Sequence, residues 1–336
     1  MNYKYKLSVI VPCYNVENYL DLSLQCLAEQ WDNDKNIQFI LVNDGSTDKT
    51  LSKLKQFKQE HDKNTVLINK PNGGLSSARN AGLKVVEGRH VTFFDPDDAL
   101  VYGSYQYLYE HFIENSVYNT LSFKTNQIHA KGFVKNMCLE TSFLNAEPQV
   151  EYEGNGHDFF LKFNTYVTWI FFYSTKLLKD NNLSFDENLS FLEDTLFNLH
   201  YFFLPGVYVR RVDCCVHFWI NRKESLSSFI GTSSKLTKMI GCCMVYLEHL
   251  EKFKKLHSED QALCKRIEYF QKQKSAVSAM LLHSDMGINQ IITVRKRLHE
   301  MKLFPFQYKG IKSFIYNVMF YIPALFLLAR LFFKQK

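Results

Sequence analysis

Four aspartates follow two short apolar runs in the first hundred residues. Asp44 comes two residues after the end of one run, and Asp95, Asp97 and Asp98 come after another. A single aspartate in such a place makes an ordinary turn, because Asp, Asn, Gly and Ser favour turns. Gathered in one place, carboxylates would instead hold Mg²⁺ or Mn²⁺, which takes one or two carboxylates and bridges to phosphates. The residue types therefore predict a metal-assisted site for a phosphate-bearing molecule.

Two further apolar runs end in polar residues of the same kind. The first is followed by Pro12-Cys13-Tyr14-Asn15, and the other by Asn69 to Gly74 and then Ala78-Arg79-Asn80. Arg79 could place positive charge at the phosphates or contact a base, although a lone arginine more commonly makes an ion pair on a helix surface. The pattern lacks G-x-G-x-x-G after the first run and lacks G-x-x-x-x-G-K-[ST], which excludes a dinucleotide fingerprint and a P-loop.

A fifth feature lies about a hundred residues later, in the segment Ser190 to Phe197. Leu192, Leu196 and later apolar residues recur at helical spacing. Ser190 and Glu193 fit a capping box, which would put Asp194 in the first turn. The helix dipole there favours an ionised carboxylate, and such a group can accept a proton from a hydroxyl. Simple complementation of the dipole is the alternative explanation for Asp194.

Alternating strands and helices position these residues. Continuous apolar runs at 7–11, 37–42, 65–68 and 90–94 are typical of strands buried on both faces, and helical spacing connects them at 20–27, 51–57 and 76–86. Repeated units of this kind predict a mostly parallel α/β sheet with right-handed crossovers. Because ligands bind outside the carboxyl ends of such strands, the four polar clusters are expected to form one site.

Composition supports a globular protein whose excess charge lies at one end. The chain has 336 residues, 15% of them aromatic, and a net charge of +6. Residues 301–336 hold six basic residues and no acid, so the remaining 34 basic and 34 acidic residues cancel. This distribution argues against a nucleic-acid-binding surface. The eight cysteines form no C-x-x-C pair and no zinc-type cluster, which favours reduced thiols. No secretory signal is visible, so we expect a cytoplasmic protein.

The second half of the chain differs from the first. Residues 234–301 predict charged amphipathic helices, with Leu247, Leu250, Phe253 and Leu256 as one apolar stripe. Residues 313–329 carry no charge, are broken by Pro323 and have basic flanks. This stretch could barely span a membrane, could lie in the interface, or could pack as a buried helix. We expect membrane attachment, because the flanking charge is wholly positive.

The motifs, in this order, resemble the family 2 glycosyltransferases, the inverting group with a GT-A fold. The matching stretches are Ser8–Asn15, Val42–Asp48, Asn72–Gly82, Phe93–Asp98, and Phe185–Glu187 followed by Glu193-Asp194. The resemblance covers roughly residues 7–225 and implies a GT-A type α/β sheet flanked by helices. We accordingly predict a GT-A domain over 1–225, a helical extension over 226–305, and a basic aromatic tail over 306–336.

The resemblance also implies roles for single residues. Pro12, Tyr14 and Asp44 would surround a uracil-type base, and Asn72 and Arg79 would contact base or phosphate. Asp95 would touch the ribose and help hold the metal, Asp97 would ligate it, and Asp98 would assist. Asp194 would be the general base. The segment from His217 to Arg222 resembles one that closes over the diphosphate, with Arg222 as a donor contact, although a buried strand fits these residues equally well. Trp169 is expected to pack in the core.

These expectations amount to transfer of a sugar from a nucleotide sugar, which we expect to be UDP-linked, to a glycan or lipid-linked acceptor. The protein would act at the inner face of the cell membrane in surface polysaccharide or lipooligosaccharide synthesis. One alternative is a non-catalytic subunit of a glycan-assembly complex. Another is a nucleotidyltransferase, which would need a glycine-rich basic loop after the first strand that this chain lacks.

Overall fold

The computed structural model describes residues 2–31, 35–129, 148–163, 166–221, 233–274, 277, 280–281, 284–304 and 311–333. The chain forms two compact units. Unit 1 comprises Met1–Glu187 and Glu193–Ser225, and unit 2 comprises Asn188–Leu192 and Leu226–Lys336. The finer division at residues 226 and 306 stays a prediction.

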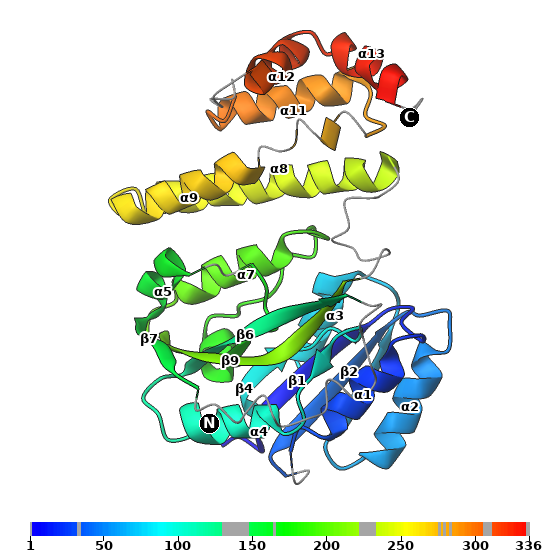
Figure 1. Cartoon of the computed structure of the whole chain (residues 1–336), viewed down its shortest axis with the longest axis vertical. Coiled ribbons are helices and arrows are strands. Elements are labelled where there is room, and N and C mark those ends of the chain that lie inside the picture. Colours follow the sequence, from blue (N-terminus) through cyan, green and yellow to red (C-terminus); the bar gives the residue numbers. More distant parts are fainter. Residues whose placement is uncertain are drawn as a thin grey trace. The chain divides into compact units, whose positions relative to one another are not determined.

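The first part of unit 1 is the predicted parallel sheet (Figure 1). Its strands run in the order β3-β2-β1-β4, and all neighbours are parallel. The strands are β1 (Tyr5–Cys13), β2 (Ile37–Asp44), β3 (Thr65–Lys70) and β4 (Gly88–Phe93). Every residue of β2 is buried, which explains why its residues are apolar or amides up to Asn43. Cys13 lies opposite Asn43, and Asn43 lies opposite Asn69, so the three strands end at one level.

The sheet continues with strands of mixed direction. Beyond β4 the order is β8-β6-β9-β5, and a further strand, β7, pairs with β9. These strands are β5 (Ala99–Leu100), β6 (Thr120–His129), β7 (Val150–Asn155), β8 (Phe171–Ser174) and β9 (Tyr208–Asn221). The β4–β8 pair is antiparallel and joins the two halves of the sheet. The segment from His217 to Asn221 is therefore part of a strand, one of the two structures expected for it.

Helices cover the sheet and carry its crossovers. They are α1 (Leu20–Ala28), α2 (Thr50–Glu60), α3 (Leu75–Leu83), α4 (Ser104–Phe112), α5 (Gly156–Lys162), α6 (Thr175–Asp180) and α7 (Glu193–Phe202). Helix α3 approaches β1 closely at Gly82, where an added Cβ would lie 2.6 Å from Ile10 Cγ2. Helix α3 ends at Leu83, earlier than the predicted Val86, and Gly88 already belongs to β4.

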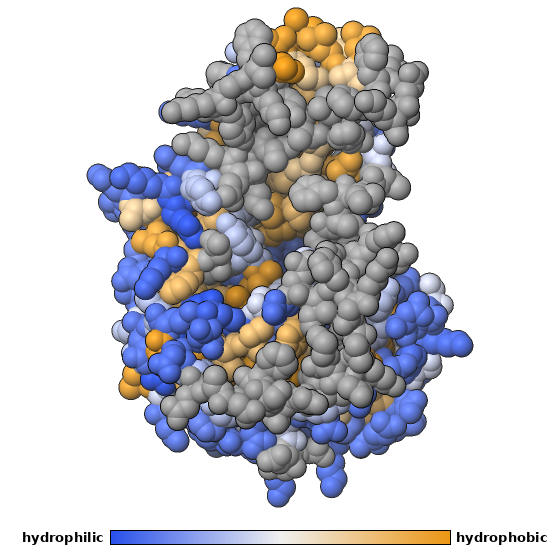
Figure 2. All heavy atoms as spheres, viewed as in Figure 1, coloured by the Kyte–Doolittle hydropathy of each residue, from blue (hydrophilic) through white to orange (hydrophobic). Residues whose placement is uncertain are grey.

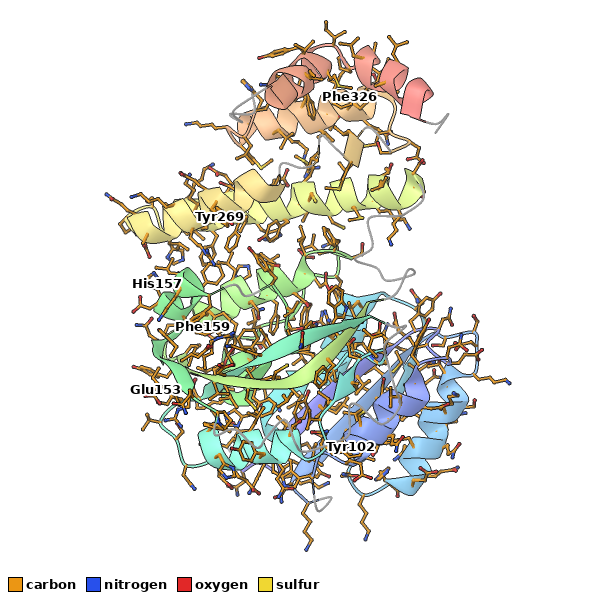
Figure 3. All side chains as sticks on the ribbon, in the orientation of Figure 1. Tyr102, Glu153, His157, Phe159, Tyr269 and Phe326 are labelled. Carbon is orange, nitrogen blue, oxygen red and sulfur yellow. The ribbon has the colours of Figure 1, made fainter. Side chains whose placement is uncertain are left out.

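Aromatic side chains fill the space between α5, α7 and the sheet. Phe159 packs on Phe202 and Phe171, with ring centroids 5.0 and 6.0 Å apart (Figure 3). Phe185 stacks on Phe197 of α7 at 4.1 Å with nearly parallel planes. The aromatic composition is thus used chiefly as core, and it fixes α7 against the strands that carry the site.

Unit 2 is helical in its described residues. Its helices are α8 (Ser233–Leu256), α9 (Gln261–Lys274), α11 (Ile288–Glu300), α12 (Ile311–Tyr321) and α13 (Ala324–Phe333). The predicted stripe on α8 is buried at Leu247, Leu250 and Phe253, but Leu256 is 76% exposed because α8 ends there. Ion pairs join the helices, for example Arg297 to Glu248 at 2.6 Å.

The apolar C-terminal stretch forms two short helices, which meet near Pro323. Phe326 of α13 packs on Phe320 of α12 at 5.1 Å (Figure 3). Within the described residues, no helix is long and apolar enough to cross a membrane. Among the side chains that the structure describes here, large apolar ones are nevertheless about half exposed at Ile315, Tyr321, Ile322 and Leu328.

Candidate active site

The expected base-contacting residues follow β1 and β2. Pro12 is buried within β1, and Tyr14, just past the strand, is 50% exposed. Asp44 ends β2 with a side chain only 3% exposed. Because β1 and β2 are paired up to Cys13 and Asn43, these residues lie at adjacent strand ends. The edge therefore offers an exposed aromatic ring beside a buried carboxylate.

Asp44 ties the loop after β3 to the end of β2. Its carboxylate accepts hydrogen bonds from the backbone amides of Gly73 and Gly74, at 3.0 and 2.8 Å, and pairs with Lys70 Nζ at 2.5 Å. Gly45 has a φ of +73°, and an added Cβ would lie 2.6 Å from the Asn72 amide nitrogen. Only glycine fits that position without strain. Asn72 itself is exposed at this rim.

Arg79 joins β4 to helix α7. Its side chain is 1% exposed and contacts three carboxylates: Asp194 at 2.5 Å, Glu193 at 3.1 Å and Asp95 at 3.3 Å. The guanidinium thus brings together Asp95 and Asp194, which lie 99 positions apart in the sequence. In this structure Arg79 is directed at carboxylates, and the predicted contact with the donor stays a prediction. The alternative expected for Arg79, an ion pair on a helix surface, is instead a buried cluster with three carboxylates.

The protonation of this cluster follows from burial. Burial raises the pKa of Asp194 to about 8, with the carboxylates of Glu193 and Asp95 acting in the same direction and Arg79 opposing them. Burial alone would lower the pKa of Arg79, but Asp194, Asp95 and Glu193 raise it. Arg79 therefore remains a cation. The helix dipole was expected to keep Asp194 ionised, but burial has the larger effect.

The start of α7 differs from the predicted capping box. The helix begins at Glu193, the Glu193 side chain bonds Arg79, and Ser190 Oγ lies 3.4 Å from Cys242 Sγ. Leu192 precedes the helix with a φ of +72°, in the left-handed region that costs a non-glycine residue about 1–2 kcal/mol. The carboxylates of Glu193 and Asp194 therefore lie at a helix start with irregular backbone geometry.

The turn after β4 is held from two sides. Ser23 of α1 donates its hydroxyl hydrogen bond to the carbonyls of Pro96 and Asp98, at 2.7 and 3.0 Å. Asp98 is 1% exposed, lies 2.9 Å from His217 Nε2 and accepts a 3.2 Å hydrogen bond from the Ile220 amide. Burial raises the pKa of Asp98 well above its usual value and lowers the pKa of His217 to about 3.

The buried pair with His217 distinguishes Asp98 from Asp95 and Asp97, the other two aspartates of the turn. Trp169 stacks on the His217 ring at 4.3 Å, so both aromatic residues belong to the core, as predicted for Trp169. Asp95 remains 28% exposed and Asp97 is half-buried. Asp98 thus acts as an anchor of the turn, whereas the side chains of Asp95 and Asp97 stay partly exposed.

This donor set fits Mg²⁺ or Mn²⁺. Both ions accept oxygen ligands, need only one or two carboxylates from a protein, and complete their shell with phosphates and water. Asp97 and Asp95 supply two such carboxylates at the end of one parallel strand. Among the described residues there is no group of three or more His, Cys, Asp or Glu side chains placed to hold a metal.

Sequence reasoning missed several contacts at this edge. The Lys70–Asp44 pair, the Asp98–His217 pair and the link from Asn80 to the backbone of Phe185 were not predicted. Lys70 was visible as a cation directly after a predicted strand, so its position was a usable signal. The other two join residues more than a hundred positions apart. Arg222, the remaining predicted donor contact, lies outside the described residues.

The fold resembles solved GT-A-type transferases. One is the S. aureus TarS 1-349 fragment in complex with UDP-GlcNAc, with a TM-score of 0.57, 20% identity, and coverage of 96% of this chain and 81% of that one. Another is the mannosyltransferase PcManGT of Pyrobaculum calidifontis in complex with GDP-Man and Mn²⁺, with a TM-score of 0.52, 14% identity, and coverage of 98% and 88%. These likenesses define the class of fold, which is GT-A-like, as predicted.

The model of the family "Glycosyl transferase family 2" matches residues 8–179, and the chain belongs to that family. It is 33% identical over 205 residues to the uncharacterized glycosyltransferase EpsJ of Bacillus subtilis, covering 58% of this chain and 56% of EpsJ. It is 44% identical over 114 residues to the minor teichoic acid biosynthesis protein GgaB of the same organism, covering 34% of this chain and 13% of GgaB. The matches thus span well under two thirds of these relatives.

Proposed function

We propose that the chain transfers a sugar from a UDP-sugar to a hydroxyl of a cell-surface polymer, with inversion at the anomeric carbon. The observation that carries this proposal is the Arg79 cluster, which links Asp194, the candidate base on α7, to Asp95 after β4. The site would thereby hold both a donor and a group that activates an acceptor.

The polymer class is suggested by what the relatives are named for. TarS of Staphylococcus aureus, a poly(ribitol-phosphate) beta-N-acetylglucosaminyltransferase, is 32% identical over 196 residues, which cover 58% of this chain and 32% of that protein. GgaB is named for minor teichoic acid synthesis. We therefore propose a polyol-phosphate polymer or a related surface glycan as acceptor, and a hexosyl or N-acetylhexosaminyl group as the transferred sugar.

In this mechanism the predicted side chains bind the donor, hold the metal and activate the acceptor. Tyr14 would stack on the base, Pro12 and Asp44 would line its pocket, and Asn72 would contact base or phosphate. Asp95 would also reach the ribose. Asp194 would remove the proton of the acceptor hydroxyl as its oxygen attacks the anomeric carbon opposite the diphosphate. Asp97 and Asp95 would hold Mg²⁺ or Mn²⁺, which stabilises charge on the departing diphosphate. Arg222 stays a proposed donor contact.

A panel of UDP-sugars tests the proposal, with UDP release measured in the presence and absence of polyol-phosphate acceptors. We expect acceptor-dependent release with one sugar, and an Asp194→Asn variant that still binds UDP but loses transfer. Glu193→Gln is the matched control, because it changes the neighbouring carboxylate on the same arginine. UDP binding by the parent without acceptor-dependent UDP release, and hence no difference between the parent and Asp194→Asn, would favour the non-catalytic subunit. Release of pyrophosphate from a nucleoside triphosphate would favour the nucleotidyltransferase.

We also propose that the C-terminal helices attach the protein to the inner face of the cell membrane. Ile322 and Leu328 are each 53% exposed, and the sequence around them carries basic residues and no acid. Figure 2 shows apolar residues gathered on the part of the surface formed by α12 and α13. Replacing Ile322 and Leu328 by Glu should abolish flotation with anionic vesicles, whereas Leu256→Glu, an exposed site on α8, should not. Flotation unaffected by the double replacement would exclude this attachment.

A further inference from the structure

The loops after β1 and β2 are joined by a reciprocal pair of hydrogen bonds at Asn15. The Asn15 backbone amide donates to Ser46 Oγ at 3.1 Å, and its side-chain Oδ1 accepts from the Thr47 backbone amide at 2.9 Å. The Thr47 hydroxyl also donates to the same oxygen at 3.4 Å. One residue thus holds the other loop through both its backbone and its side chain.

The next residues continue the connection. The Val16 amide donates to Thr50 Oγ1 at 2.9 Å, and the Glu17 amide donates to Asp48 Oδ2 at 3.1 Å. In return, the Lys49 amide donates to Glu17 Oε2 at 2.7 Å. We call residues 15–17 together with residues 46–50 the loop clasp. Its bonds run in both directions, so neither loop can shift without breaking several of them.

The backbone at Asn15 explains why asparagine suits this position. Its φ is +50°, in the left-handed region, which asparagine adopts more readily than other non-glycine residues. Glycine could take the same backbone conformation, but it has no side-chain acceptor for the Thr47 amide. Asparagine meets both requirements.

The two halves of the loop clasp each follow, in the sequence, a residue assigned to the base pocket. Asn15 directly follows Tyr14, and Ser46 lies two positions after Asp44. Between Asp44 and Ser46, Gly45 lies against the Asn72 backbone of the third loop. The exposed Tyr14 ring stands on a loop whose position the clasp sets.

We propose that Asn15 is a positioning residue for the nucleotide donor, acting through the loop clasp without touching the ligand. The inference rests on the proposed function, because it takes Tyr14 and Asp44 to bind the base. A loop that is already ordered loses less conformational freedom on binding, so a preformed pocket binds more tightly. The clasp therefore contributes to donor affinity more than to stability, since its hydrogen bonds lie at an exposed rim.

Three variants of Asn15 separate the effect of its left-handed backbone from that of its side-chain hydrogen-bond acceptor. Asn15→Gly keeps the left-handed backbone and removes the acceptor, Asn15→Ala removes both, and Asn15→Asp keeps both. Asn182 provides the matched control, because it is also exposed, also has a φ of +50°, and lies in the turn after α6. Its Gly and Ala variants carry the same backbone change away from the loop clasp.

UDP affinity is measured by calorimetry with Mg²⁺, in about 0.3 M salt to screen the charge added by Asp. We expect Asn15→Gly to weaken UDP binding about fivefold or more, the scale of one lost hydrogen bond, and Asn15→Ala to weaken it further. Asn15→Asp should stay within about threefold of the parent, and both Asn182 variants should bind UDP as the parent does. Hydrogen exchange at the Thr47 amide should speed up in Asn15→Gly and not in Asn15→Asp.

The outcomes distinguish this inference from the function on which it rests. A parent that binds UDP and an Asn15→Gly variant that binds it equally well would overturn the inference alone. A parent that binds no UDP would overturn the proposed function and the inference together. A common fall in melting temperature and UDP affinity in the Asn15 and Asn182 variants would mean that Asn15 has only a structural role.

Discussion

Raising the pH should increase the rate of transfer along the titration curve of one buried carboxyl group. The pKa of Asp194 is raised to about 8, because the side chain is buried among other acids. A base with that pKa is about 9% ionised at pH 7, half ionised at pH 8 and about 91% ionised at pH 9. We therefore expect kcat/KM to rise about fivefold from pH 7 to 8 and about tenfold from pH 7 to 9.

The assay is UDP release at low donor concentration and fixed Mg²⁺, because kcat/KM reports the groups of the free enzyme. Glu193→Gln removes a negative charge that raises the Asp194 pKa, so its profile should shift to lower pH. Asp194→Asn should lose the pH dependence and about 10²–10⁴ of the rate. A histidine cannot imitate this curve at His90 or His217, because burial lowers the pKa of each to about 3.

The same carboxyl group should influence stability with a defined sign. Between the usual pKa of 3.8 and about 8, Asp194 keeps its proton in the folded protein and loses it in the unfolded chain. The folded state then binds more protons, so its contribution to the free energy of unfolding falls as the pH rises through this window. Urea unfolding of Asp194→Asn should depend less on pH than that of the parent. A flat rate profile from pH 6 to 9, or a Glu193→Gln profile shifted upward, would refute the reasoning.

Three further predictions test other parts of the site. Arg79→Met should lower the free energy of unfolding by about 3–5 kcal/mol at pH 8 and by less at pH 5, as measured in urea, because it leaves buried carboxylates without their cation. Gly45→Ala should destabilise unit 1 by about 1–3 kcal/mol and weaken UDP binding, because its Cβ meets the Asn72 backbone; unchanged UDP affinity would contradict this. Chelation should abolish transfer and Mn²⁺ should restore it, whereas full turnover in excess EDTA would show that Asp97 holds no required metal.

Local patterns were enough to predict the parallel half of the fold. The four apolar runs became β1 to β4 with ends within a few residues of those expected, because strands buried on both faces leave an unbroken apolar signature. The shared edge followed from the rule that parallel strands end together. The half of the sheet with mixed strand directions was not predicted, because β6, β8 and β9 pair over long sequence separations that no local pattern encodes.

At the site, residue types were easier to predict than their partners. Asp194 was singled out by its place in a helix start, but its contact with Arg79 depends on how α7 packs against α3. The expected ionisation of Asp194 considered the helix dipole and omitted burial, which sequence spacing cannot reveal. Asp98 looked like its two neighbours, and only the position of His217 in β9 distinguishes it.

The five residues that join unit 2 from the middle of the chain limit how this protein could be recombined. Asn188–Leu192 leave unit 1 and belong with residues 226–336, and the chain returns to unit 1 at Glu193, one position before the candidate base. A gene fusion that exchanged only the C-terminal portion would remove the residues that this pentapeptide contacts in unit 2, including Cys242, which contacts Ser190. A working chimera would need Asn188–Leu192 and the C-terminal segment of unit 2 from the same parent, so the C-terminal helices cannot be exchanged on their own.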